Sequence, residues 1–187
     1  APNSFEAYGE EEIQAVVSCL RDGWLAGFGK KTVEFEEKVS DLFGKKYGIF
    51  VNSGSSACLL AIACLDLPKG SGFKPVFCDV NLTSYVPEID DVVSKITENT
   101  KAVMIPNLIG NKPNWKSLKE KLIEINRQDI VVIEDSADTI TMTEETDIST
   151  TSFYASHIIT AGGAGGMVMF NNEDHLNKAL QYRDWGR

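Results

Sequence analysis

The pattern of this sequence predicts an α/β fold built on a mostly parallel sheet. Short apolar runs at residues 75–80, 102–105 and 130–133 alternate with segments of helical periodicity. Such alternation is typical of strands joined by crossover helices. The run Ile130-Val131-Val132-Ile133 is apolar throughout, as expected of a central strand that helices cover on both faces.

The remaining elements follow from periodicity and from residues that end helices. Helices are predicted where apolar side chains recur at helical spacing, at residues 13–20, 33–43, 57–67, 87–96, 115–125 and 173–185. Further strands are predicted at residues 47–51, 151–154 and 167–170. Gly23 and Gly44 stand where C-terminal caps of the first two helices are expected, and Pro68 and Gly70 end the third.

Size and charge narrow the classes of function. A chain of 187 residues with 43% hydrophobic residues is long enough to bury the core of one domain. The formal charge of −9, from 27 acidic and 18 basic side chains, argues against a nucleic-acid partner and against binding to an acidic membrane. Any phosphate site is therefore expected to be local.

The protein is expected to be cytoplasmic. It contains no apolar run near the roughly 18 residues that cross a bilayer, and its acidic first residues lack the pattern of a signal peptide. The four cysteines show no CxxC spacing, so they are expected to be reduced thiols, and no metal site is predicted.

Ser53-Gly54-Ser55-Ser56 lies between a predicted strand and a predicted helix. Free backbone N–H groups and hydroxyls at a helix N-terminus bind phosphate well. An N-terminal cap beside a glycine turn is the simpler alternative for such a short motif.

Glu134-Asp135 ends the apolar strand, and polar side chains at the carboxyl end of a parallel strand indicate a site. Asp135 is alternatively a helix cap. Asn107 also follows a strand and is interpreted as a turn residue without a chemical role.

The segment from Ser152 to His157 precedes a glycine run at residues 162–166. A strand rather than a helix follows the glycines, which argues against a dinucleotide-binding loop and favours a tight hairpin. Taken alone, a histidine beside Ile158 is most often an ordinary hydrogen-bonded residue.

Together these motifs resemble the vitamin B6-dependent sugar-nucleotide aminotransferases of fold type I (DegT/DnrJ/StrS type). Ser152-Phe153-Tyr154-Ala155-Ser156-His157 resembles their Ser-Phe-x-x-x-Lys segment, with His157 in place of the lysine that binds pyridoxal phosphate (PLP). A minority branch of the family carries histidine there and dehydrates the sugar. The resemblance implies the large PLP-binding domain of fold type I, a three-layer arrangement of helices around a mostly parallel sheet.

The resemblance also implies roles for individual residues. His157 would be the general base of a 3-dehydratase that uses pyridoxamine phosphate (PMP) or PLP, because imidazole titrates near neutral pH. Asp135 would face the coenzyme ring nitrogen, and Asp138 stands where dehydratase relatives show aspartate. The residues implied to hold the coenzyme phosphate are Gly54, Ser55, Ser56 and Ser152.

The implied substrate is a nucleotide-linked 4-keto-6-deoxyhexose, and the implied assembly is a homodimer. Dehydratases of this kind either couple to an iron–sulfur cluster or regenerate PMP from L-glutamate, and both routes stay open. The absence of cysteine from Glu134 to Asp138 favours the route without a cluster. Three alternatives remain: an aminotransferase of the same family, a non-catalytic homologue that binds coenzyme or nucleotide-sugar, and a plain α/β binding domain.

Residues 1–187 are expected to form the PLP/PMP-binding large domain with internal segments missing. Relatives carry another strand and helix, including an aromatic residue that stacks on the coenzyme, where this sequence passes directly from Ser71 to Gly72. The small C-terminal domain of the relatives is expected to lie outside this sequence.

Overall fold

The computed structural model describes residues 8–24, 27, 29–65 and 72–186. Its helices are α1 (Glu10–Asp22), α2 (Lys30–Leu42), α3 (Gly54–Ala63), α4 (Ile89–Ser94), the 3₁₀ turn η1 (Leu108–Gly110), α5 (Trp115–Glu124) and α6 (Glu173–Arg183). Its strands are β1 (Tyr47–Val51), β2 (Ala102–Pro106), β3 (Val131–Asp135), β4 (Ile148–Ser152) and β5 (Gly166–Phe170).

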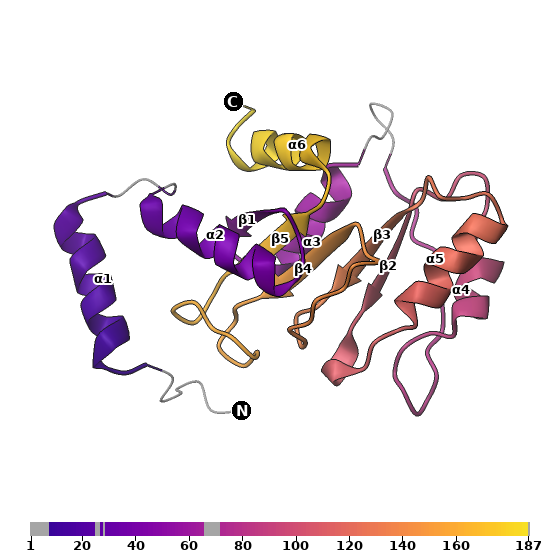
Figure 1. Cartoon of the computed structure of the whole chain (residues 1–187), viewed down its shortest axis with the longest axis horizontal. Coiled ribbons are helices and arrows are strands. Elements are labelled where there is room, and N and C mark those ends of the chain that lie inside the picture. The colour runs from indigo at the N-terminus through magenta and orange to yellow at the C-terminus, as the bar shows by residue number, and fades with distance from the viewer. Residues whose placement is uncertain (1–7, 25–26, 28, 66–71, 187) are drawn as a thin grey trace.

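The strands form one mixed sheet in the order β1-β5-β4-β3-β2 (Figure 1). Strands β2, β3 and β4 pair in parallel, whereas β5 pairs antiparallel with both β4 and β1. Among the described strands, β5 is therefore the one that runs against the others. This confirms the predicted α/β fold with a mostly parallel sheet.

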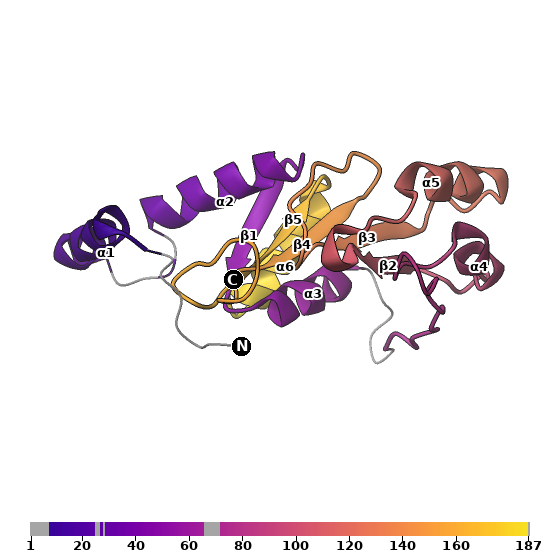
Figure 2. The same cartoon turned by 90° about the horizontal axis from the view of Figure 1, so that it is seen from below.

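Helices cover both faces of the sheet, so the predicted three layers are present (Figure 2). Helices α3 and α6 bury one face, where Ile133, Val168 and Phe170 join a cluster with Leu60 and Ala61 of α3. Helices α2 and α5 lie over the other face. Because side chains alternate along a strand, each strand of the sheet sends residues into both layers.

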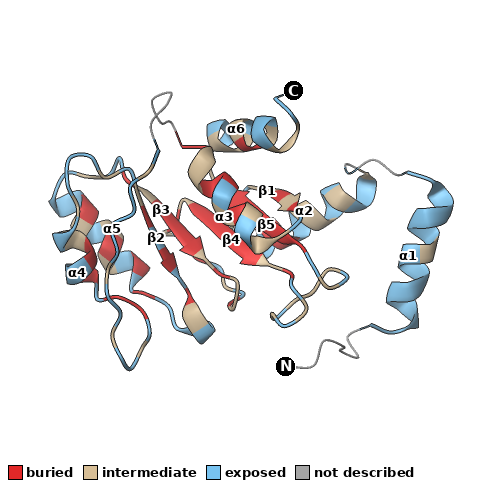
Figure 3. Ribbon diagram, turned by 180° about the vertical axis from the view of Figure 1, so that it is seen from behind, coloured by how far each residue is buried: buried red, intermediate tan, exposed pale blue. Residues whose placement is uncertain are grey.

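Burial is concentrated in the central strands (Figure 3). All five residues of β5 are buried, which matches a strand with a neighbour on each side and helices on both faces. Helix α1 is the opposite case, because none of its residues is buried. It forms as predicted and ends at Gly23, whose φ of 69° is the left-handed value of a C-terminal cap.

The strand predicted at residues 75–80 is wrong. These residues have no regular structure, and the side chains of Val76 and Phe77 are 66% and 85% exposed. Strand β2 pairs with β3 and stands at the edge of the described sheet. An apolar run becomes a strand only when it pairs with a neighbour, which periodicity does not reveal.

Other boundaries shift for local reasons. The strand predicted at residues 151–154 begins earlier, at Ile148, because the polar residues Ser149 and Thr150 pair within the sheet. The helix predicted at residues 57–67 begins at Gly54, and residues 66–67 lie outside the described part of the chain. The tight hairpin predicted at the glycine run is wrong in its length. Strands β4 and β5 pair antiparallel, but the long segment of residues 153–165 connects them.

Within the described residues, no helix has both the length and the apolar character needed to cross a bilayer.

Candidate coenzyme site

The first turn of α3 meets the end of β4. Ser53 caps the helix by accepting a hydrogen bond from the backbone N–H of Ser56 at 3.1 Å. A Cβ atom on Gly54 would lie 2.8 Å from Cβ of Ser152, closer than side-chain carbons approach. Glycine at this position therefore allows the Ser152 side chain to lie against the start of the helix.

The start of β5 also packs closely against the start of α3. A Cβ atom on Gly166 would lie 2.3 Å from the carbonyl carbon of Ser53, so the start of β5 also touches the start of α3. The predicted phosphate-binding residues Gly54, Ser55, Ser56 and Ser152 are thus brought to one helix N-terminus. Its partial positive charge and serine hydroxyls suit an anion.

Asp135 lies on the same face of the sheet as Ser152. It pairs with Thr150 of β4, and Ser152 is two residues further along that strand. Two residues of a strand span about 7 Å. Cys58 of α3 confirms the orientation, because its Sγ donates to Oδ2 of Asp135 at 3.8 Å and lies 3.4 Å from Oγ1 of Thr150.

The carboxyl of Asp135 is held in a setting that disfavours its charge. Burial raises the pKa of Asp135, and the carboxyl of Asp138 adds to this effect. The backbone N–H of Ala137 donates to Oδ1 at 3.2 Å, and the thiol of Cys58 is a weak donor. A cationic group beside this carboxyl would oppose the effect of burial.

His157 lies in the connection between β4 and β5, and its side chain is 25% exposed. Its Nδ1 is 3.0 Å from Oδ1 of Asp138. The ring of Tyr154 packs edge-on against the imidazole, with centroids 6.2 Å apart. A carboxylate at Nδ1 favours the tautomer with hydrogen on that atom, so Nε2 keeps a lone pair that can accept a proton.

The segment after His157 is tied to the N-terminal part of the chain. The hydroxyl of Tyr8 accepts a hydrogen bond from the backbone N–H of Gly162 at 2.7 Å. Thr160 donates through Oγ1 to the carbonyl of Phe153 at 3.1 Å and accepts from the N–H of Gly163 at 3.0 Å. These contacts give the glycine-rich connection a defined path.

Asn107 is a residue that sequence reasoning missed. Interpreted as a turn residue, it is instead 1% exposed, and its Nδ2 donates to Oε2 of Glu134 at 2.8 Å and to Oγ of Ser136 at 2.7 Å. Its position at the carboxyl end of a strand, where Asp135 also lies, was the available signal. Cys58 and Thr150, which lie beside the carboxyl of Asp135, were not predicted as site residues. Neither the apolar sequence around Cys58 nor the polar sequence around Thr150 indicates that its side chain faces a carboxylate.

Lys45 is a buried lysine, but the carboxylate near it is Glu134 and not Asp135. The buried Lys45 donates through Nζ to the carbonyl of Thr143, and burial lowers the pKa of Lys45 against the opposing effect of Glu134. Glu134 precedes Asp135 in β3, so the two carboxylates point to opposite faces of the sheet. Lys45 is therefore not a substitute for an amine at position 157.

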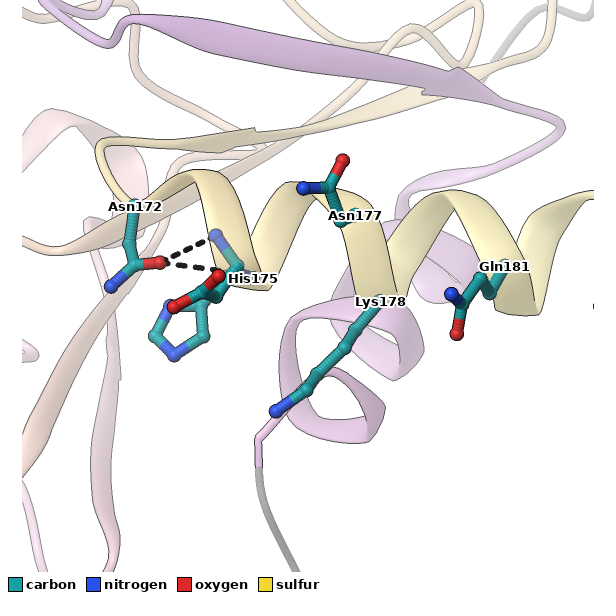
Figure 4. A pocket seen from close by; sticks show the side chains of 6 residues that line it. Asn172, His175, Asn177, Lys178 and Gln181 are labelled. Atoms are coloured by element: carbon teal, nitrogen blue, oxygen red, sulfur yellow. Dashed lines mark hydrogen bonds between the residues drawn. The ribbon is translucent and has the colours of Figure 1, made fainter.

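A surface hollow along α6 lies apart from these residues (Figure 4). Its lining consists of Asn172, Asp174, His175, Asn177, Lys178 and Gln181. None of the predicted site residues contributes to it.

Comparison with known proteins matches the chain to the model of the DegT/DnrJ/EryC1/StrS aminotransferase family, over residues 6–72 and 69–187. The lipopolysaccharide biosynthesis protein RfbH of Salmonella typhimurium is 31% identical over 221 residues, covering 100% of this chain and 49% of the relative. The GDP-perosamine synthase of Vibrio cholerae is 28% identical, covering 90% and 52%. The GDP-4-keto-6-deoxy-D-mannose 3-dehydratase of Escherichia coli O55:H7 is 26% identical, covering 100% and 55%.

The fold is that of solved members of this group. A structure of an E. coli GDP-4-keto-6-deoxy-D-mannose-3-dehydratase with bound hydrated PLP superimposes with a TM-score of 0.78 at 22% identity, covering 97% of this chain and 53% of that one. The chain spans about half the length of the curated relatives it matches. Because the family model covers nearly the whole sequence, this chain belongs to the DegT/DnrJ/EryC1/StrS aminotransferase family.

Proposed function

We propose that this chain is the coenzyme-binding part of a PMP/PLP-dependent 3-dehydratase acting on a nucleotide-linked 4-keto-6-deoxyhexose. The observation that carries the proposal is the contact of the His157 imidazole, through Nδ1, with Oδ1 of Asp138 at 3.0 Å. The proposal takes His157 as the residue that replaces the family's lysine. Histidine does not form the stable covalent bond with PLP that a lysine amine forms. The coenzyme is then held by noncovalent contacts alone, which favours its amine form, PMP.

The residues present fit this coenzyme. Gly54 lets the Ser152 side chain lie against the start of α3, and this helix N-terminus, with Ser55, Ser56 and Ser152, offers donors for the phosphate. Asp135, on the same face of the sheet, offers a carboxylate for the ring nitrogen. A protonated ring nitrogen next to Asp135 provides the positive charge that this partly buried carboxyl lacks.

The bound coenzyme would supply an electron-accepting ring for the dehydration. His157 would be the general base, accepting at Nε2 the proton whose removal allows loss of the C3 hydroxyl. Asp135 would hold the ring nitrogen in its protonated form. Asp138, whose Oδ1 lies 3.0 Å from Nδ1, would orient the imidazole.

The names of the relatives support the substrate class and leave two reactions. One is a GDP-4-keto-6-deoxy-D-mannose 3-dehydratase, and another is a GDP-perosamine synthase. The second name favours an aminotransferase as the alternative function. His157 favours the dehydratase, because a transaminase of this family uses the amine that the histidine replaces.

We propose the remaining properties on the same basis. They are a cytoplasmic homodimer, L-glutamate as the amino donor that regenerates PMP, and a large domain at residues 1–187 from which internal segments are missing. The family model matches in two pieces that overlap at residues 69–72, which is where a further strand and helix were expected. An iron–sulfur cluster remains the alternative to L-glutamate.

The substitution His157→Lys tests the role of this position. The variant should bind PLP covalently, so that borohydride reduction leaves the coenzyme on the protein, whereas the parent chain should release PMP on dialysis. The matched control Lys45→Arg changes a buried amine elsewhere and should not alter coenzyme retention. A His157→Lys protein that never binds PLP covalently would show that residue 157 does not face the coenzyme. A chain with no affinity for PMP or PLP would support a non-catalytic role.

A further inference from the structure

We infer that Asn107 and Asp138 are positioning residues that hold the imidazole of His157 in one tautomer, with hydrogen on Nδ1 and the lone pair on Nε2. The inference rests on the proposed function only in making Nε2 the acting base. The tautomer itself is a property of the chain without coenzyme.

Asn107, directly after β2, is buried and fully hydrogen-bonded. All the hydrogen-bonding atoms of its side chain have partners: Nδ2 donates to Glu134 and Ser136, and Oδ1 accepts from Nε1 of Trp115 at 3.3 Å. Its backbone N–H donates to the carbonyl of Asp135 at 2.8 Å. A buried amide with this many partners has one orientation available.

Asn107 also fixes the segment that follows β3. Its backbone carbonyl accepts from Oγ1 of Thr139 at 2.8 Å, and its side chain binds Ser136. The backbone of Ser136 is held on the other side by β4, since its N–H donates to the carbonyl of Thr150 and its carbonyl accepts from Oγ1 of Thr151. Asp138 therefore lies between two anchored residues, 136 and 139.

Asp138 itself makes the contact that matters for His157. Its carboxyl is 38% exposed and Oδ1 lies 3.0 Å from Nδ1 of the imidazole. A carboxylate accepts hydrogen bonds and does not donate them, so this contact requires hydrogen on Nδ1. No described residue hydrogen-bonds to Nε2, which leaves the opposite side of the ring for a reacting proton.

Glu134 explains why the network is buried so deeply. Its side chain is fully buried, and its carboxylate accepts from Asn107, from Oγ1 of Thr146 at 3.1 Å and from Oγ of Ser149 at 2.5 Å. These bonds tie β2, β3 and β4 together on the face opposite Asp135. Because Asn107 in turn binds Ser136 and Thr139, this buried cluster supports the segment that carries Asp138.

The test measures the tautomer directly in the 187-residue chain with ¹⁵N-labelled histidine. Nitrogen chemical shifts distinguish the two neutral tautomers at a pH of about 8.5, well above the ordinary pKa of histidine. His157 and His175 are the two histidines of the sequence, so a His157→Gln variant assigns the signals. We expect the parent chain to show His157 mainly with hydrogen on Nδ1.

Three variants separate positioning from general stability. In Asp138→Asn the amide can donate to Nδ1, so the population with hydrogen on Nε2 should rise to a substantial fraction. Thr139→Val removes the hydroxyl bound to Asn107 with little change in volume and should shift the ratio in the same direction by a smaller amount. Thr141→Val is the matched control, because Thr141 is partly buried, accepts from Lys112 and lies outside the network; it should leave the ratio unchanged.

The result that overturns the inference is a tautomer ratio that is the same in the parent, Asp138→Asn and Thr139→Val chains. Equal effects of Thr139→Val and Thr141→Val would also overturn the part assigned to Asn107. If the full-length enzyme turns over, Asp138→Asn should lower kcat with little change in KM for the sugar. A correct tautomer in a chain that binds no coenzyme would contradict the proposed function and leave this inference standing.

Discussion

At the scale of single residues, the site contains two aspartates, Asp135 and Asp138, whose carboxyl groups have different electrostatic surroundings. Asp135 is a carboxyl whose ionisation is disfavoured by burial, and Asp138 is a more exposed carboxyl in contact with an imidazole. The first setting suits a permanent cationic partner, and the second suits orientation of a base. Neither carboxyl is replaceable by the other.

The pH dependence of folding follows from the raised pKa of Asp135. Below the ordinary aspartate pKa of 3.8, the folded and unfolded chains both carry the neutral acid, and burial costs little. As pH rises above that value, the unfolded chain loses its proton first, so folding becomes less favourable up to the higher pKa of the folded chain. Asp135→Asn should therefore raise the free energy of unfolding at pH 7 by about 1 kcal/mol and change it little at pH 3.

Urea denaturation of the coenzyme-free chain at the two pH values measures this effect. Asp41→Asn, at an exposed position of α2, is the matched control and should change stability by less than about 0.5 kcal/mol at both. The same Asp135→Asn variant should bind PMP more weakly. A loss of stability at pH 7 would instead indicate that Asp135 acts as a structural cap.

At the scale of elements, the site depends on the junction of α3, β4 and β5. Two glycines at this junction, Gly54 and Gly166, permit distances that no side chain tolerates. An isolated bridge between Ser53 and Gly165 adds to the contact. The helix N-terminus is therefore placed by packing against the two central strands, and its ability to bind an anion depends on that placement.

Gly54→Ala should destabilise the chain by about 1–3 kcal/mol, because its Cβ would meet Ser152 at 2.8 Å. Adding Ser152→Gly should recover most of this loss, since the nearest remaining atom, Cα of residue 152, is at 3.4 Å. A double-mutant cycle measured by urea denaturation gives the coupling energy between the two positions. Ser55→Ala, in the same helical turn but exposed, is the control for stability. Additive effects at positions 54 and 152 would contradict the contact.

At the scale of the whole molecule, burial is uneven. Strands β4 and β5 lie in the middle of three layers, whereas α1 has no buried residue and carries exposed apolar side chains at Ile13, Val16 and Leu20 (Figure 3). Stability is not uniform in such a structure, because local opening costs little where few contacts are lost.

Native-state hydrogen exchange should show weaker amide protection in α1 than in β4 and β5. Amides of α1 should exchange through local opening with little protection, and those of β4 and β5 should exchange only with global unfolding. Mild denaturant should leave the exchange of α1 nearly unchanged and accelerate that of β5. Equal protection of α1 and β5 would mean that a partner covers the helix in solution.

The sequence by itself was sufficient for the class of fold, for most helices and strands, and for the family. Helical periodicity, the caps at Gly23 and Gly44, and the apolar run at residues 130–133 depend on interactions within a few residues, so they can be seen in the sequence. Glu134-Asp135 at the end of an apolar strand was visible for the same reason, whereas Asp138, Ser152 and His157 were chosen through the resemblance of their segments to the family's motifs.

Contacts between residues far apart in the chain were decided only by the tertiary structure. The antiparallel placement of β5 between β1 and β4, the failure of residues 75–80 to pair, and the burial of Asn107 among Glu134, Ser136 and Trp115 each depend on which strands become neighbours. The contact between Asp138 and His157 joins residues 19 positions apart through two separately anchored loops. Periodicity reports which face of an element is apolar, but the partner of that face is selected by packing of the whole chain.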